Sequence, residues 1–325
     1  MENIAQIKKD GISVIICCYN SSWIIKRSLE ALEKQVIPKG LGWEVVIVDN
    51  NSTDNTKLLV NSIIAFSSLN IILVEEKKAG LLNARKKGIK SVSYQYSIFC
   101  DDDNIFSENY VYSMYKRMCS DVNIGCIGGR GVPDLLSEPY PEFKQFMGAY
   151  ALGNQRKNPF LFGAGLCVRT QLVNEIYDSQ TFYLVGRCGN KLLAGDDNEL
   201  VASILLRGYY KIYIDDLVFI HVIKAERLTW DYLKKMFVGF AMAHPIIYTM
   251  ECVIENRSFC FVLFDIFRSC LMLIKKLPFI YNRTELLYFS YHYNIIKAYR
   301  YWGFKRIFKL QRSLPTLKNE LSSRC

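Results

Sequence analysis

The sequence lacks several features that would assign a protein to a class at once. The first residues, MENIAQIKKDGIS, contain no apolar stretch of the kind found in secretory signal peptides, so we expect the chain to begin in the cytoplasm. The 11 cysteines are scattered and form no C-x-x-C pair, which disfavours a disulfide framework and a structural zinc site. Because 50% of the residues are hydrophobic, we expect a packed core rather than disorder.

Glycine is missing from the first predicted turn between a strand and a helix. This turn reads CCYNSSW at 17–23, so the G-x-G-x-x-G fingerprint of dinucleotide-binding proteins is absent where it would have to occur. The later GCIGGRG stretch follows another strand and does not open a helix. A phosphate-binding P-loop is also absent. Phosphate groups would therefore have to be held by a metal ion and by basic side chains.

Acidic residues are scarce in the last part of the chain. Residues 231–325 hold 15 Lys and Arg against 6 Asp and Glu, so this segment carries almost the whole net charge of +10. A basic, aromatic segment is typical of contact with nucleic acid or with an anionic membrane surface. The apolar content of this segment is too high for a surface that binds the phosphate backbone of a nucleic acid, so binding of nucleic acid is not expected.

The first part of the chain alternates strand and helix patterns, which predicts βαβ units and a largely parallel sheet. Ser22 and Asp54 are the predicted caps of the first two helices. A more irregular part of the sheet is predicted at 124–168, and a helix with acids at its amino end follows at 194–210. Predicted buried strands lie at 12–19, 43–48, 70–75 and 95–100, and two further short strands at 211–214 and 217–223.

From Thr229 onward the pattern is helical. The segment 258–280 has nearly the length of a membrane span, but it contains Asp265 and Arg268 near its middle, which disfavours spanning. Two alternatives remain open for 229–325. Its helices lie in the membrane interface, or they form a subdomain that packs on the sheet or on a second copy of the chain.

Three aspartates in a row, Asp101, Asp102 and Asp103, follow the predicted strand at 95–100. Ligands of open α/β sheets bind at the carboxyl ends of the strands, where Asp49 is also expected. Three adjacent carboxylates repel one another unless a positive charge lies between them. A hard cation such as Mg²⁺ or Mn²⁺, bound together with substrate phosphates, meets this need. The alternative is a solvated acidic loop.

Six motifs in order, SVIICCYN, WEVVIVDNNSTDNT, AGLLNARKKGI, FCDDDN, FGAGLCVRTQL and AGDDNEL, resemble those of family 2 glycosyltransferases with the GT-A fold. The resemblance runs from about residue 12 to about residue 222. It implies a Rossmann-like mixed α/β sheet with helices on both faces in residues 1–228, followed by a helical, basic and aromatic region in 229–325.

The resemblance also implies roles for single residues. Asp103 matches a ligand of Mn²⁺ or Mg²⁺ in a D-x-D pattern, and His221 is a candidate second ligand. Asp197 matches the catalytic base, with Asp196 in place of a more frequent Glu. Cys17 stands where the family usually has Pro, and Lys86 where it usually has Asn. The residues expected near the nucleotide are Tyr19, Asn20, Asp49, Arg85, Asp101 and Asp102.

The chemistry of sugar transfer agrees with these roles. A cation stabilises the departing nucleoside diphosphate, and a carboxylate on the other side of the sugar takes the proton of the attacking hydroxyl. The resemblance implies transfer of one sugar with inversion. The expected partners are a nucleotide sugar, UDP-linked by default, and a glycan or lipid-linked glycan of surface polysaccharide synthesis. A cytoplasmic protein at the inner face of the membrane is expected. A non-catalytic sugar-nucleotide-binding protein and a nucleotidyltransferase are the alternatives.

Overall fold

The computed structural model describes residues 8–179, 182–184, 186, 194–258 and 260–322. In this part of the chain an eight-stranded mixed sheet has the strand order β3-β2-β1-β4-β7-β6-β8-β5. The strands are β1 (Lys9–Cys18), β2 (Trp43–Asp49), β3 (Ile71–Glu75), β4 (Tyr94–Asp101), β5 (Asn104–Phe106), β6 (Ile124–Leu135), β7 (Leu166–Arg169) and β8 (Tyr210–Ile223). The predicted parallel sheet is confirmed for β1 to β4, whereas β7 and β5 run antiparallel to their neighbours.

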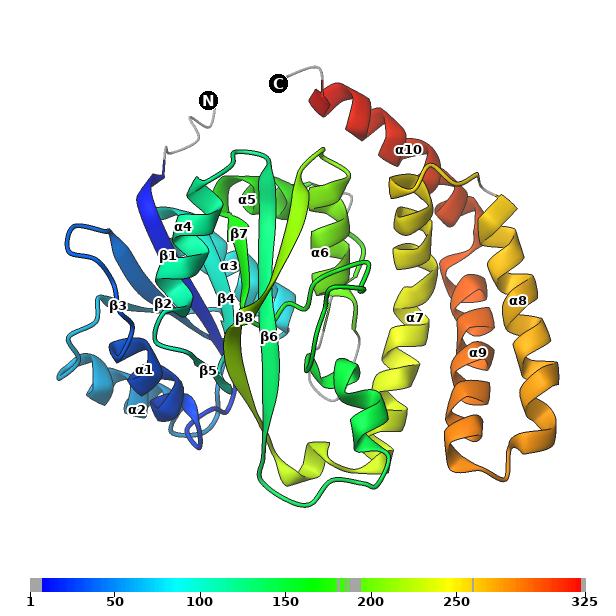
Figure 1. Cartoon of the computed structure of the whole chain (residues 1–325), viewed down its shortest axis with the longest axis horizontal. Coiled ribbons are helices and arrows are strands. Elements are labelled where there is room, and N and C mark those ends of the chain that lie inside the picture. Colours follow the sequence, from blue (N-terminus) through cyan, green and yellow to red (C-terminus); the bar gives the residue numbers. More distant parts are fainter. Residues whose placement is uncertain (1–7, 180–181, 185, 187–193, 259, 323–325) are drawn as a thin grey trace.

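Helices cover both faces of this sheet (Figure 1). Alternate side chains of β1 explain why: Val14 and Ile16 point into one hydrophobic cluster and Ile15 into the other. Such strands are apolar at nearly every position because neither face meets water. The helices and 3₁₀ turns are α1 (Ile25–Glu33), α2 (Thr56–Ile64), α3 (Leu81–Ser91), α4 (Tyr110–Cys119), η1 (Phe143–Tyr150), α5 (Thr170–Asp178), α6 (Asp196–Leu205), η2 (Ala225–Arg227), α7 (Trp230–Ile254), α8 (Cys260–Lys276), η3 (Leu277–Phe279), α9 (Arg283–Trp302) and α10 (Phe304–Ser322).

Some of the predicted local structure is wrong. The two short strands expected at 211–214 and 217–223 form one 14-residue strand, β8. Ser22 does not cap α1; its hydroxyl instead donates to Asp54 Oδ2 at 2.7 Å. Asp54 does cap α2, as predicted, because its Oδ1 accepts the N–H of Thr56, the first residue of the helix, at 2.9 Å. It does so from two residues before the helix, since Asn55 lies between them. The segment 124–168 is more regular than expected, since β6 alone spans 12 residues.

The C-terminal helices stand beside the sheet as a separate stack (Figure 1). α7 and α10 share a hydrophobic cluster with α6 through Ala243, Ile246, Met250, Leu310 and Leu314. α7 and α10 therefore pack against α6, while the two alternatives for this region were packing on the protein or contact with a membrane. The boundary at 228/229 stays a prediction.

Among the described residues, α7 alone has the length and composition of a membrane-crossing helix, with a hydropathy of 1.5 over its most apolar window. Half of that window is buried inside the protein, and a core helix of a soluble protein has the same properties.

Candidate active site

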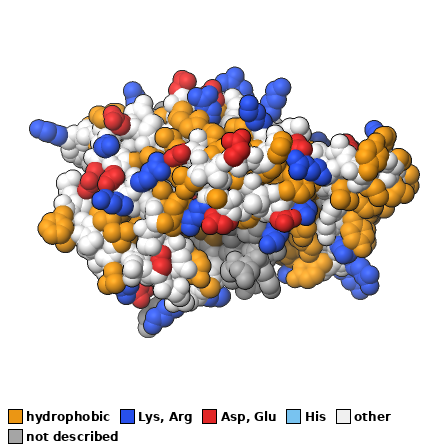
Figure 2. Space-filling model, turned by 90° about the horizontal axis from the view of Figure 1, so that it is seen from below, with side chains coloured by type: hydrophobic (Ala, Val, Ile, Leu, Met, Phe, Trp, Pro, Cys, Tyr) orange, Lys and Arg blue, Asp and Glu red, His pale blue; other side chains and the backbone are white. Residues whose placement is uncertain are grey.

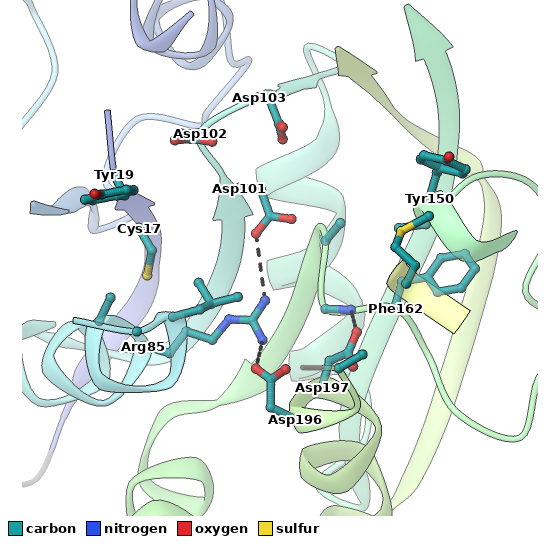
Figure 3. Close-up of a pocket in the computed structure, with 18 of the residues that line it drawn as sticks. Cys17, Tyr19, Arg85, Asp101, Asp102, Asp103, Tyr150, Phe162, Asp196 and Asp197 are labelled. Carbon is teal, nitrogen blue, oxygen red and sulfur yellow. Dashed lines mark hydrogen bonds and ion pairs between the residues drawn. The ribbon is translucent and has the colours of Figure 1, made fainter. Parts of the chain in front are cut away.

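A cavity of about 630 Å³ opens where β1 and β4 end. Most of the predicted site residues line it: Tyr19, Arg85, Asp101, Asp102, Asp103, Asp196, Asp197 and His221. Figure 3 shows that they surround the cavity from several sides, with the three consecutive aspartates on one side and the Asp196–Asp197 pair on another. A volume of this size is typical of sites for small molecules and cofactors.

Asn20 and Asp49 are not among the described residues that line this cavity. Asn20 shapes the loop beside it, since its Oδ1 accepts the N–H of Thr53 at 2.8 Å. Asp49 is buried and accepts the N–H of Ser52 at 3.4 Å. The next residue, Asn50, does line the cavity. The roles predicted for Asn20 and Asp49 in nucleotide binding stay predictions.

The register of two strands brings His221 to the aspartates. The chain turns sharply after Asp101, and β5 pairs antiparallel with β8 so that Asn104 lies opposite His221. The main-chain oxygen of Asp103 accepts the N–H of Val222 at 2.9 Å, which ties the turn to β8. As a result, His221 Nε2 lies 3.5 Å from Asp103 Oδ1.

The orientation of His221 suits a cation. Its Nδ1 lies 2.8 Å from the main-chain oxygen of Tyr150, so Nδ1 carries the proton that it donates there. In the neutral ring, the lone pair of Nε2 then faces the carboxylate of Asp103, and two electron-rich groups repel unless a positive charge separates them. Burial lowers the pKa of His221, but the Asp103 carboxylate raises it more, so the pKa is raised.

The donor set around Asp103 fits a divalent metal ion only in part. Among the residues that the structure describes, no group of three His, Cys, Asp or Glu side chains is placed to hold a metal. A carboxylate oxygen and an imidazole nitrogen are nevertheless ordinary ligands of divalent cations, and substrate phosphates often complete such sites. Asp103 and His221 therefore fit a cation that arrives with a phosphate-bearing ligand.

Arg227 of η2 provides the positive charge in this structure. Its guanidinium donates to Asp103 Oδ2 at 2.9 Å. Nearby, the ammonium of Lys224 lies 4.0 Å from the centre of the Trp23 ring, a cation–π contact between η2 and the start of α1. Here Arg227 reaches the aspartate expected to bind the metal.

Asp102 is turned toward α1. Its carboxylate accepts a hydrogen bond from the Ser21 hydroxyl, and its main-chain oxygen accepts one from the Ser28 hydroxyl at 2.6 Å. Burial and the neighbouring Asp103 raise the pKa of Asp102 to about 7. The three aspartates therefore differ in their environments: Asp101 faces Arg85, Asp102 faces α1, and Asp103 faces His221 and Arg227.

Arg85 of α3 connects the two groups of acids. It is only 4% exposed, and its guanidinium lies 3.0 Å from Asp196 Oδ2 and 3.8 Å from Asp101 Oδ1 (Figure 3). Burial lowers the pKa of Arg85, but Asp196 and Asp101 raise it more, so the pKa is raised and the side chain keeps its charge. The resemblance placed Arg85 near the nucleotide. The structure adds an ion pair that spans the cavity wall.

Asp197 is held by main-chain N–H groups. Its Oδ2 accepts the N–H of Gly163 at 3.0 Å, the dashed line that ends at Asp197 in Figure 3. Its Oδ1 accepts the N–H of Asn198 at 2.8 Å. Asp197 is also the second residue of α6, where the helix dipole favours negative charge. Gly163 must be a glycine here, because an added Cβ would lie 2.8 Å from Arg85 and 2.9 Å from Asp197. These hydrogen bonds therefore hold the carboxylate in position at the cavity wall.

Sequence reasoning missed an aromatic and apolar part of the cavity. Tyr150 of η1 and Phe162 line it together with Tyr232, Met236 and Phe240 of α7. The rings of Tyr150 and Tyr232 stack with centroids 6.4 Å apart. The aromatic content of the C-terminal region was visible in the sequence, but its contact with a cavity some 130 residues away in the chain was not.

The fold and the cavity define a class of protein. Ligands of α/β sheets bind outside the carboxyl ends of the strands, and the acidic clusters and the buried Arg85 line a cavity at this place. A family model described as Glycosyl transferase family 2 matches residues 13–174. The chain belongs to glycosyltransferase family 2, as the six motifs predicted.

Two curated relatives are glycosyltransferases by name. A poly-beta-1,6-N-acetyl-D-glucosamine synthase of Staphylococcus aureus is 29% identical over 120 residues, 37% of this chain and 28% of that protein. The poly(ribitol-phosphate) beta-glucosyltransferase of Bacillus spizizenii is 33% identical over 140 residues, 40% of this chain and 22% of that protein. The chain thus matches only about a quarter of the length of these relatives.

Solved structures confirm the predicted GT-A fold. TarS of Staphylococcus aureus in complex with UDP-GlcNAc is 16% identical, with a TM-score of 0.53, 91% of this chain covered and 93% of that chain. The mannosyltransferase PcManGT of Pyrobaculum calidifontis, solved with GDP-Man and Mn²⁺, is also 16% identical with a TM-score of 0.53. The match covers 92% of this chain and 87% of PcManGT.

Proposed function

We propose that the protein transfers a single sugar, with inversion, from a nucleotide-diphosphate sugar to a hydroxyl group of a glycan or lipid-linked glycan. The observation that carries the proposal is that the Asp101–Asp103 turn with His221 and the fixed carboxylate of Asp197 line one cavity from different elements. One group of acids serves the donor and the other serves the acceptor hydroxyl. The names of the two curated relatives, a poly-N-acetylglucosamine synthase and a poly(ribitol-phosphate) glucosyltransferase, support a place in the synthesis of such polymers.

The donor end of the proposed site holds the nucleoside diphosphate. Asp103 and His221 would hold Mn²⁺ or Mg²⁺ there, and Arg85, Asp101 and Tyr19 line the wall beside them. Such an ion supplies positive charge that stabilises the departing diphosphate. TarS binds UDP-GlcNAc and PcManGT binds GDP-Man with Mn²⁺, so a UDP sugar is the first donor to test and a GDP sugar the second.

The proposed chemical step is a direct displacement. The carboxylate of Asp197 takes the proton of the acceptor hydroxyl as its oxygen attacks the anomeric carbon. The bond from that carbon to the diphosphate breaks, and the nucleoside diphosphate leaves with the bonding electrons. The N–H groups of Gly163 and Asn198 hold the base in position without taking its charge.

The acceptor end of the proposed site is formed by η1 and α7. Tyr150, Tyr232, Met236 and Phe240 offer apolar surface and ring faces rather than charge. A sugar ring presents a C–H face that buries against such a surface, with its hydroxyls left for the few polar groups. We therefore expect an uncharged sugar, rather than a bare polyol phosphate, at the reacting end of the acceptor.

Exchange of the base tests the proposal. Asp197→Asn keeps the size of the side chain and removes its ability to take a proton, so sugar transfer should fall on the order of 10²- to 10⁴-fold. The matched control is Asp216→Asn on the exposed side of β8, which should transfer at the wild-type rate. The reaction is followed as release of nucleoside diphosphate from a panel of UDP, dTDP and GDP sugars with Mn²⁺.

Donor binding is measured in parallel as the rise in melting temperature, which a ligand causes by mass action. Asp197→Asn should keep the rise that the wild type shows. An active Asp197→Asn variant would contradict the base assignment. A donor-dependent rise without turnover in the wild type would favour the non-catalytic alternative, and release of free diphosphate would favour a nucleotidyltransferase.

A further inference from the structure

The outward side of α8 is covered with large apolar side chains. Their spacing of three and four residues along Phe264, Phe267, Leu271 and Ile274 places them on one side of the helix. Further exposed apolar residues continue the surface through η3 to Tyr281. The members of this surface, called the α8 face below, are 40% to 84% exposed: Phe261, Leu263, Phe264, Phe267, Leu271, Ile274, Leu277, Phe279, Ile280 and Tyr281.

The view from below shows the same concentration of hydrophobic side chains over the end of the molecule that α8 and α9 form (Figure 2). Single exposed apolar residues are normal on protein surfaces. A group of ten large ones on one side of a helix and the segment after it instead marks a contact site.

Polar contacts on the opposite side of α8 fix which side faces outward. Asp265 is fully buried, and its Oδ2 lies 2.8 Å from Nε2 of His244 on α7. The same oxygen accepts a hydrogen bond from the hydroxyl of Tyr299 on α9 at 3.0 Å. Buried Val262 and Ser269 lie on this inward side as well. Rotation of α8 would break these contacts, so the exposure of the apolar side is built into the packing.

The charges of α8 indicate what covers the apolar surface. Asp265 is the only acid of α8, and it faces inward. The charged side chains of α8 that reach solvent are basic: Lys275 is exposed, and Arg268 is half-exposed while its guanidinium donates to Asp265 Oδ1 at 2.6 Å. Two copies of this surface would bring like charges together. An apolar helix side whose own solvent-facing charges are cationic instead matches an anionic lipid layer.

We propose that the α8 face lies in the interface of an anionic membrane, with α8 parallel to the bilayer plane. The aromatic and aliphatic side chains enter the region below the headgroups, and Arg268 and Lys275 stay at the anionic headgroups. α7 is the more hydrophobic helix, but half of its most apolar window is buried, and Val238 alone among its large hydrophobic side chains is exposed. The exposure of the apolar side chains, rather than the hydropathy of the helix, therefore points to α8. This contact does not depend on the proposed sugar transfer.

Sedimentation with lipid vesicles tests the proposal. The full chain is mixed with vesicles of phosphatidylcholine containing about one third phosphatidylglycerol, or of phosphatidylcholine alone. We expect binding to the anionic vesicles that weakens as salt is raised, because salt screens the headgroup charges. Strong binding that is equal on both lipids and insensitive to salt would overturn the anionic assignment. Absence of binding to either would overturn the membrane contact.

Variants separate the apolar part from the charged part. Phe264→Ser with Phe267→Ser should weaken binding on the order of tenfold per phenylalanine, and Lys275→Gln about fivefold. The matched control is Phe66→Ser, since Phe66 is 93% exposed beside α2, far from α8 in the fold. It should bind as the wild type does. Equal loss in the control would contradict the proposal.

The molecular mass in solution tests the alternative that a second copy of the chain covers the α8 face. Light scattering of the wild type without lipid should give one chain. A dimer that the pair Phe264→Ser and Phe267→Ser dissociates would show that a second copy covers the α8 face. All variants change exposed side chains, so their circular dichroism and melting temperatures should match the wild type.

Discussion

The buried ion pair between Arg85 and Asp196 gives the sharpest test of how the cavity is built. Arg85→Met keeps most of the length of the side chain and removes its charge. The carboxylate of Asp196, of which 8% of the side chain is exposed, then loses its partner at 3.0 Å. Asp101, 34% exposed, loses a weaker one at 3.8 Å. Two negative charges would remain near each other without the buried cation.

The size of the effect follows from the burial of the carboxylate. Removal of one partner of a buried pair costs about 3 to 5 kcal/mol in the free energy of unfolding, because the remaining charge stays desolvated. The exposed pair of Lys90 and Asp178 provides the contrast: its atoms lie 2.6 Å apart, yet both side chains are about half exposed. Lys90→Met should therefore cost less than about 1 kcal/mol.

The assay is urea unfolding at neutral pH of four proteins: the wild type, Arg85→Met, Asp196→Asn and the double variant. The double variant removes both charges, so we expect it to recover about 2 kcal/mol relative to the sum of the single changes. The reasoning would be refuted if Arg85→Met cost no more than Lys90→Met, or if the effects of the two single changes simply added.

Two further predictions concern the surroundings of Asp197 and the C-terminal helices. Gly163→Ala places a Cβ within 3.0 Å of Arg85 and Asp197, so it should lower the transfer rate at least tenfold; unchanged turnover would contradict the close fit. Burial raises the pKa of Asp265, but hydrogen bonds from His244 and Tyr299 and the charge of Arg268 lower it more, so the pKa is lowered. A lowered carboxyl pKa stabilises the fold above the ordinary value of about 4, and this contribution is lost as pH falls through the lowered pKa. The difference in unfolding free energy between wild type and Asp265→Asn should therefore be full at pH 7 and shrink below about pH 4, and a difference independent of pH would contradict it.

The prediction of β8 as two strands failed for a physical reason. The sequence between the two expected strands contains Asp215 and Asp216, which local preference assigns to a turn. In the fold, β8 pairs with β6 on both sides of this point, and the register shifts between Gly128 and Arg130. Asp215 accepts a hydrogen bond from Asn154 at 3.1 Å, and Arg130 lies 3.8 Å away. Tertiary partners thus stabilise a polar pair inside a continuous strand.

The sequence by itself determined the parts of this protein that depend on local patterns. Continuous apolar runs specify strands buried on both faces, and the acids that follow them must lie at the carboxyl edge of a parallel sheet. This was enough to place Asp101, Asp102 and Asp103 beside one cavity and to put Asp197 at the start of a helix.

The tertiary structure decided what depends on contacts between distant segments. Strand register brings His221 to Asp103, a loop brings the N–H of Gly163 to Asp197, and α7 supplies an apolar wall to the cavity. Periodicity gives α8 an apolar side, but only the buried contacts of Asp265 decide that this side points outward. Local patterns set which side of an element is apolar, whereas packing against distant partners sets what that side meets.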